Sequence, residues 1–411
     1  MPTIDPPSGQ PRIPATVWVL GFVSMLMDIS SEIIHALLPV FMVTVLAVSA
    51  TTVGVIEGIA EATALIVKVF SGVISDYFGR RKLLVVIGYG MAALSKPLFP
   101  LAASVGWVFF ARFVDRIGKG IRGAPRDALI ADVSPPEIRG AAFGLRQSLD
   151  TVGAFVGPLL ALGLMLLWAN DFRAVFWVAV IPAFLALALL IFGVREPERV
   201  APESGPASAV ARANRRAFPI SRSALRQLGP DYWWVVGVGA ALTLARFSEA
   251  FLVLRALQGG LALALTPLVL VLMNLVYAAC AYPFGLMADK VNKRTLLTLG
   301  ILPLIAADLL LAQGGSLPWL GAGLICWGLH MAATQGLLAA LVADSAPPEL
   351  RGTAYGFFNL ASGVGMLIAS TVAGVLWDQA GAQATFYAGA VFAAASLLLL
   401  LLRGTWSVRS A

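Results

Sequence analysis

Long apolar runs separated by short polar loops divide most of the 411-residue chain. A helix needs about 20 apolar residues to cross a bilayer, and twelve runs reach that length. Six lie in the first half, at 15–46, 50–75, 82–103, 105–128, 140–168 and 172–193; six follow, at 231–256, 265–288, 294–312, 318–343, 353–377 and 383–403. The pattern therefore predicts an all-α membrane protein with twelve transmembrane helices.

Polar stretches between and around these runs set the domain organisation. The longest, 194–228, is rich in Arg, Pro and Ser and has no apolar period, which is typical of a linker. We therefore expect five segments: a tail at 1–14, a six-helix bundle at 15–193, the linker at 194–228, a second six-helix bundle at 229–403, and a tail at 404–411.

Two loop motifs occur twice, each time separated by about half of the chain. The first occupies the loop near residue 80 and recurs near residue 290; its members are Gly72, Asp76, Gly79, Arg80 and Arg81, then Gly285, Asp289, Lys293 and Arg294. The second contains Pro136, Glu137, Arg139 and Gly140, then Pro348, Glu349, Arg351 and Gly352. Two unrelated motifs with one spacing indicate a duplication, so the two bundles should be pseudo-symmetric.

Composition supports a membrane location. The chain is 59% hydrophobic and only 12% charged, with a mean hydropathy of +0.86, whereas soluble proteins contain about 25% charged residues. The sequence pI of 9.7 reflects Lys and Arg that gather in the loops on one side of the predicted helices. By the positive-inside rule, both termini and the linker should be cytoplasmic, in a multi-pass protein of the inner membrane. We therefore expect the protein to contact membrane lipid, and we expect no nucleic-acid partner.

Catalytic and metal-binding motifs are not found in the sequence. HExxH, GxSxG and P-loop patterns are missing, so an enzyme is not expected. The two cysteines, Cys280 and Cys326, lie within apolar runs, and the only histidines are His35 and His330. We therefore predict no cofactor and no metal site.

Charged residues inside the predicted helices concentrate in the first half. Asp28, Glu32 and His35 share one face of the first helix, and the fourth carries a mainly basic stripe formed by Arg112, Asp115, Arg116, Lys119 and Arg122. A charge at the bilayer centre costs about 2.5–3.5 kcal/mol, so each must face protein or water. Such groups either form ion pairs that only hold helices together or take part in transport. Asp28, Glu32 and Asp115 are the candidates for exchanging protons.

These features resemble the major facilitator superfamily over nearly the whole chain, which implies two six-helix bundles that work by alternating access. The resemblance implies a latch between the bundles, built from the repeated loops: Gly72, Asp76, Gly79, Arg80, Arg81, Glu137, Arg139, Asp289, Arg294, Glu349 and Arg351. It also implies that Arg112 assists proton transfer, although Asp115 and Arg116 replace the family's Gln-Gly at that motif. Gly153, Gly157 and Pro158 resemble the motif of proton-driven exporters, and we expect these glycines to pack against the other bundle.

The preferred function is therefore secondary active transport, with proton-coupled export of a small organic molecule by a monomer. The predicted substrate contacts are Arg116, Lys119, Arg146, Asp150, Arg246, Glu249, Asn274, Tyr277, His330 and Gln335. The basic stripe leaves open an alternative, a proton symporter that imports an organic anion. A membrane receptor or assembly factor without transport activity is a third alternative. The sequence does not identify the substrate.

Overall fold

The computed structural model describes residues 13–78, 80–194, 226–288, 290–313, 316–347 and 350–402, and these ranges are helical and contain no strands. The predicted positions Gly79, Asp289 and Glu349, the side chain of Asp76, and most of the predicted tails and linker lie outside this description. The long helices are α1 (Ala15–Thr44), α2 (Ala50–Phe78), α3 (Arg81–Ser95), α4 (Val105–Val133), α5 (Arg139–Leu167), α6 (Phe172–Gly193), α9 (Pro230–Ala245), α10 (Ala250–Gln258), α11 (Leu268–Ala288), α12 (Lys293–Gln313), α13 (Leu317–Ser345), α14 (Arg351–Ala380) and α15 (Ala382–Leu402). Short 3₁₀ segments are η1 (Lys96–Leu98), η2 (Pro136–Ile138) and η3 (Leu263–Leu265).

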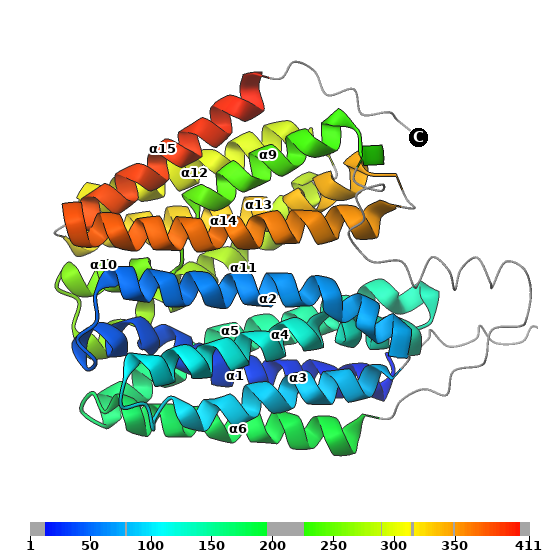
Figure 1. Cartoon of the computed structure of the whole chain (residues 1–411), viewed down its shortest axis with the longest axis horizontal. Helices are drawn as coiled ribbons and strands as arrows, with labels where there is room; N and C mark the ends of the chain where they lie inside the picture. The colour runs from blue at the N-terminus through cyan, green and yellow to red at the C-terminus, as the bar shows by residue number, and fades with distance from the viewer. Residues whose placement is uncertain are drawn as a thin grey trace, which may run out of the picture.

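The helices form two layers that meet along α2 and α14 (Figure 1). Helices α1–α6 make up the amino-terminal bundle, and α9–α15 make up the carboxyl-terminal bundle. Within the described ranges, nine helical segments are long and apolar enough to cross a membrane. Helices α2, α3 and α4 are outside that set; α3 has 15 residues, and α2 and α4 carry many charged side chains. The predicted all-α, two-bundle membrane fold is confirmed.

The sequence repeat is visible in the contacts of the repeated loops. Arg81 at the start of α3 forms an ion pair with Asp132 at the end of α4, and Lys293 at the start of α12, which corresponds to Arg80 in the motif, forms an ion pair with Asp344 at the end of α13. Arg139 donates to the Ala131 carbonyl at 3.3 Å, and Arg351 donates to the Ala343 carbonyl at 3.2 Å. The second loop motif therefore makes the same contact in both bundles, and a basic residue at the start of α3 and of α12 pairs with the repeated aspartate.

Two apolar runs do not form a single continuous helix: one helix ends before its run does, and the other run is interrupted. The run at 82–103 forms α3 only to Ser95, where η1 begins, because Pro97 lacks an N–H and disfavours a helical residue before it. The run at 231–256 is broken at Arg246–Glu249, between α9 and α10. In this break, the Ser248 N–H donates to Ser370 Oγ of α14 at 3.1 Å. A non-helical backbone at membrane depth persists only where protein satisfies its polar groups in this way.

The two bundles pack closely at the end that carries the α1–α2 connection. A Cβ at Gly374 of α14 would lie 2.6 Å from the Ala50 carbonyl oxygen, so only glycine allows this approach. Asp378 of α14 then accepts hydrogen bonds from the first N–H groups of α2, from Ala50 at 3.1 Å and Thr51 at 2.8 Å. Toward the other end, α2 turns away from α14 (Figure 1). We call these the closed end and the open end.

Candidate functional site

A cavity of about 440 Å³ lies between the bundles, beside the open half of α2. Its wall comes from α1, α2, α4 and α5 of the amino-terminal bundle and from α11 and α13 of the other. The lining residues are Asp28, Glu32, Glu61, Ala64, Leu65, Lys68, Lys119, Arg122, Gly123, Arg126, Gln147, Asp150, Thr151, Ala154, Asn274, Tyr277 and Gln335. A volume of this size suits a small organic molecule.

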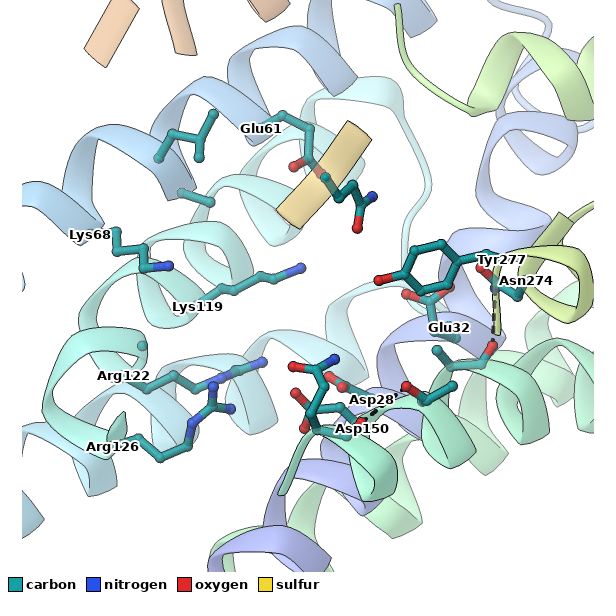
Figure 2. Close-up of a pocket in the computed structure, with 17 residues that line it drawn as sticks. Asp28, Glu32, Glu61, Lys68, Lys119, Arg122, Arg126, Asp150, Asn274 and Tyr277 are labelled. Atoms are coloured by element: carbon teal, nitrogen blue, oxygen red, sulfur yellow. Dashed lines mark hydrogen bonds between the residues drawn. The ribbon is translucent and has the colours of Figure 1, made fainter. Parts of the chain in front are cut away.

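The two sides of the cavity differ in charge. Every charged side chain in the lining belongs to the amino-terminal bundle, whereas Asn274, Tyr277 and Gln335 of the carboxyl-terminal bundle are polar and uncharged. Figure 2 shows Lys68, Lys119, Arg122 and Arg126 on one side of the cavity and the carboxylates of Asp28, Glu32 and Asp150 on the other, with the Tyr277 hydroxyl directed between them. The arrangement can bind a polar molecule between a positively charged side and a negatively charged side of the cavity.

The glycines of α5 position the two carboxylates of α1. A Cβ at Gly153 would lie 3.0 Å from Asp28 Cβ, and one at Gly157 would lie 2.6 Å from Glu32 Cβ. The expectation that these glycines pack against the other bundle is wrong, because they face α1 of their own bundle. Small residues permit this close approach of two helices, and it holds Asp28 and Glu32 at the cavity wall.

A chain of charged groups leads from Glu32 into the interior. The Glu32 carboxylate lies 3.5 Å from His35 Nδ1, and His35 Nε2 lies 3.9 Å from Glu57. Glu57 in turn accepts two hydrogen bonds from Arg112, at 3.1 and 2.6 Å, and both side chains are almost wholly buried. His35 thus stands between a carboxylate at the cavity and a carboxylate in the interior, as a proton relay would.

A second set of ion pairs connects η1, α4 and α2. Lys96 in η1 donates to Asp115 at 2.8 Å and to Ser31 at 3.0 Å. Next to Asp115 on α4, Arg116 pairs with Glu61 of α2 at 3.2 Å, and Glu61 lines the cavity. In such a buried ion pair each charge depends on its partner, because removal of one partner leaves the other as an uncompensated buried charge.

The predicted site residues divide between the cavity and its surroundings. Those at the wall are Asp28, Glu32, Lys119, Asp150, Asn274, Tyr277 and Gln335. Those that do not line it are Arg112, Asp115, Arg116, Arg146, Arg246, Glu249 and His330. The first three occupy the buried ion pairs described above; Arg146 pairs with Asp150 at 2.6 Å. Arg246 and Glu249 lie at the helix break, and His330 donates to the Gly300 carbonyl at 2.7 Å.

Several lining residues were not among the predicted contacts, and the sequence repeat holds a signal for some of them. Glu61 stands in the same relation to Gly72 as Asn274 does to Gly285, and both line the cavity. Gly123 and Gln335 are related in the same way through Asp132 and Asp344. Lining positions in one bundle therefore indicate lining positions in the other.

Four of the predicted latch residues, Arg81, Arg139, Arg294 and Arg351, contact their own bundles. Besides the repeated contacts of Arg81, Arg139 and Arg351, Arg294 donates to the Leu401 carbonyl of α15 at 2.7 Å. Arg80 and Glu137 are exposed at the open end. Since the bundles diverge at this end, these loops brace each bundle separately here. Among the described residues, no cluster of His, Cys, Asp and Glu has the arrangement of a metal site.

Comparison with protein families gives a match to the model of the Major Facilitator Superfamily over residues 20–244 and 250–409. The chain belongs to this superfamily. It is 33% identical over 392 residues, 94% of each chain, to an uncharacterized MFS-type transporter of Methanocaldococcus jannaschii. The chain is therefore a membrane transporter of the superfamily, and secondary transport is its general activity.

Two further proteins show how far the likeness extends. Multidrug resistance protein 1 of Bacillus subtilis is 32% identical over 151 residues, 37% of this chain and 38% of that protein. A bacterial homologue of the human lysosomal transporter Spinster, solved in an inward-facing and occupied conformation, superimposes with a TM-score of 0.74 at 16% identity, covering 96% of this chain and 97% of that one. The structural likeness shows the superfamily fold.

Proposed function

We propose that this superfamily member couples the movement of protons to the export of a small organic molecule. The cavity between the bundles is the substrate site, and Asp28 and Glu32 are the carboxylates that exchange protons. Alternating access would expose this site first to one side of the membrane and then to the other.

The observation that carries the proposal is the position of Glu32. It lies at the cavity wall, is held there by the backbone of α5 at Gly157, and is joined through His35 to the buried Glu57. A carboxylate that a substrate can reach and that is linked to interior titratable groups can release its proton when substrate binds. Asp28, which lies one turn away on α1, shares the cavity.

Loop charges support an orientation with the open end in the cytoplasm. Arg80, Arg81, Lys82 and Arg139 all lie at this end, and the positive-inside rule places such loops in the cytoplasm. The structure then corresponds to an inward-facing state of an inner-membrane protein with cytoplasmic termini, ready to take up a cytoplasmic molecule. The partial likeness to a multidrug resistance protein also favours export.

Proton-coupled import of an organic anion is the second candidate function, since Lys68, Lys119 and Arg122 give the cavity a basic side. The two functions differ in the sign of the driving gradient. Export predicts that substrate moves against the inward flow of protons, and import predicts that both move together.

The test uses the purified full chain. Compounds that raise its unfolding temperature in a metabolite and drug panel are offered to proteoliposomes that contain a pH-sensitive dye. We expect counterflow of the bound compound, and we expect net movement only when a pH gradient is imposed. With the protein inserted in a known orientation, reversing the gradient distinguishes export from import. Compounds that bind but show neither counterflow nor gradient-driven movement would instead favour a receptor without transport activity.

A further inference from the structure

Among the residues that the structure describes, three of the cations in the cavity wall have no carboxylate partner. Among the described residues, the lining contains the carboxylates of Asp28, Glu32, Glu61 and Asp150 and the cations of Lys68, Lys119, Arg122 and Arg126. Glu61, Asp150 and Glu32 are each engaged, with Arg116, Arg146 and His35 respectively. Arg126 is engaged with Asp127 at 3.2 Å and Ser24 at 2.9 Å.

Within the described lining, Lys68, Lys119 and Arg122 have no ion-pair partner, and Asp28 is the one carboxylate that contacts no basic side chain within 4.0 Å. In the described part of the chain, none of these three cations lies within 4.0 Å of a carboxylate oxygen. The net charge of these three cations and Asp28 is positive. Since an unpaired charge at membrane depth is unfavourable, these cations favour a negatively charged partner in the cavity.

Arg122 shows the deficit most clearly. Its side chain is 5% exposed, its guanidinium stacks on the Tyr89 ring with 4.5 Å between the guanidinium carbon and the ring centre, and its Nη1 has no hydrogen-bond acceptor. A buried guanidinium with an unused donor is expected to find an acceptor in the bound state. Figure 2 shows that the Arg122 and Lys119 side chains extend toward the same part of the cavity.

Packing between α2 and α4 keeps these cations together. A Cβ at Gly120 of α4 would lie 2.6 Å from Val67 Cβ and 3.0 Å from the Ala64 carbonyl oxygen of α2. This close contact places Lys119, next to Gly120, beside Lys68, next to Val67. The cations are thus held in position by the helix backbones before a ligand arrives, which reduces the entropy lost on binding.

On the basis of the proposed transport function, we propose that Lys68, Lys119 and Arg122 form an oxyanion subsite, so that the transported molecule is a small organic anion. Its carboxylate or phosphate group binds between α2 and α4, because guanidinium and ammonium groups both recognise these oxyanions. The rest of the molecule extends toward Asn274, Tyr277 and Gln335, whose uncharged polar groups suit a neutral polar skeleton.

The experiment measures binding to the purified full chain, independently of transport. Three compounds with the same carbon skeleton serve as probes: succinate, its neutral diamide succinamide, and the dication 1,4-diaminobutane. Inorganic phosphate is a fourth probe, which separates carboxylate from phosphate preference. The apparent Kd is taken from the concentration dependence of the unfolding temperature, at constant ionic strength so that screening is equal.

We expect succinate or phosphate, but neither the diamide nor the diamine, to stabilise the protein. Lys119→Gln and Arg122→Gln should each weaken that binding about tenfold or more, because each removes a charge-assisted hydrogen bond. Lys119→Arg, which keeps the charge, should retain it. The matched control is Lys290→Gln, since Lys290 is exposed in the α11–α12 connection, away from the cavity.

Stabilisation by 1,4-diaminobutane, anion binding unchanged by Lys119→Gln and Arg122→Gln, or no response to any oxyanion would each overturn the proposed subsite. The proposed transport function fails separately: anions that bind through these cations, but that never move across the membrane in proteoliposomes, would keep the subsite and remove the transport cycle. Proton-coupled movement of a cation through the same cavity would keep the proposed transport function and rule out the oxyanion subsite.

Discussion

Helix α4 of the amino-terminal bundle and helix α13 of the carboxyl-terminal bundle are equivalent in the repeat, since each ends at a repeated Ala-Asp pair. Counted back from Asp132 and Asp344, the charged positions of α4 become uncharged in α13: Arg112, Asp115, Lys119 and Arg122 correspond to Leu324, Trp327, Met331 and Thr334. In α13, Trp327 is buried against Phe247, with 5.7 Å between ring centres. The same helical frame thus carries ion pairs in one bundle and apolar packing in the other.

This difference indicates a division of labour between the bundles. The amino-terminal bundle supplies all the charged side chains that line the cavity, whereas the carboxyl-terminal bundle supplies the uncharged Asn274, Tyr277 and Gln335. Alternating access needs both bundles, whereas the proposed proton exchange and charge recognition would need only the amino-terminal one. Corresponding positions in the carboxyl-terminal bundle therefore provide control substitutions for the charged positions of the amino-terminal bundle.

The largest effect on stability is expected when one partner of the Glu57–Arg112 ion pair is replaced. Counted from Gly72 and Gly285, Glu57 corresponds to Leu270, and Arg112 corresponds to Leu324, so both positions of this ion pair are leucines in the carboxyl-terminal bundle. Glu57→Leu or Arg112→Leu alone leaves a buried charge without its partner and should reduce the free energy of unfolding by about 3–5 kcal/mol.

The double variant, with leucine at both positions, tests whether the pair serves stability or function. Its free energy of unfolding should return close to that of the wild type, since apolar pairs often replace buried ion pairs without loss, while proton-coupled transport should not return. Unfolding in mixed detergent micelles measures the first, and proteoliposome flux measures the second. Equal instability of the double and single variants would contradict the comparison.

A smaller effect is expected from Gly157→Ala. The added methyl group would contact Glu32 Cβ and, at 2.9 Å, the Ile29 carbonyl oxygen, so α1 and α5 must move apart. Overpacking of this kind costs about 1–3 kcal/mol, and displacement of Glu32 should lower transport further. Gly163→Ala on the same helix is the control, since a Cβ there meets no atom within 4 Å. Equal behaviour of the two variants would show that α5 does not position Glu32.

The smallest effect is expected from Asp378→Ala. This change removes the acceptor of the Ala50 and Thr51 N–H groups, and loss of such a helix cap costs about 0.5–2 kcal/mol. Because the cap joins the bundles at the closed end, the population of molecules open at that end should rise about two- to thirtyfold. Labelling of Ala154→Cys, with Cys280 and Cys326 replaced by Ser, measures access from each side of the membrane. Unchanged labelling from the closed side would mean that this contact does not hold the end shut.

Much of the fold follows from the sequence because each long apolar run has a single low-energy form in a membrane, the helix. The repeated motifs also indicate which loops are equivalent, as the pairs Arg81–Asp132 and Lys293–Asp344 confirm. The break at Arg246–Glu249 could not be foreseen, because its polar backbone is satisfied by Ser370, which is distant in sequence.

The site could be predicted only in part, for a similar reason. Helical spacing places Asp28 and Glu32 on one face of α1, and both line the cavity. The same spacing places Arg112 and Lys119 on one stripe of α4, yet Glu57 of α2 covers Arg112 while Lys119 stays open to the cavity. Depth within a bundle depends on the neighbouring helix. The neighbouring helix also determines the direction in which Gly153 and Gly157 of α5 pack, which is toward α1.

The most direct test of the account measures proton movement by purified protein in proteoliposomes when a transported compound is added. Asp28→Asn and Glu32→Gln should abolish gradient-driven transport but allow exchange of substrate for substrate, because binding persists without proton release. The matched control is Asp308→Asn, since Asp308 is a wholly buried carboxyl group of the carboxyl-terminal bundle that does not line the cavity; it should transport like the wild type. Normal coupling in both amino-terminal variants, or its loss only in Asp308→Asn, would contradict the assignment of proton exchange to the amino-terminal bundle.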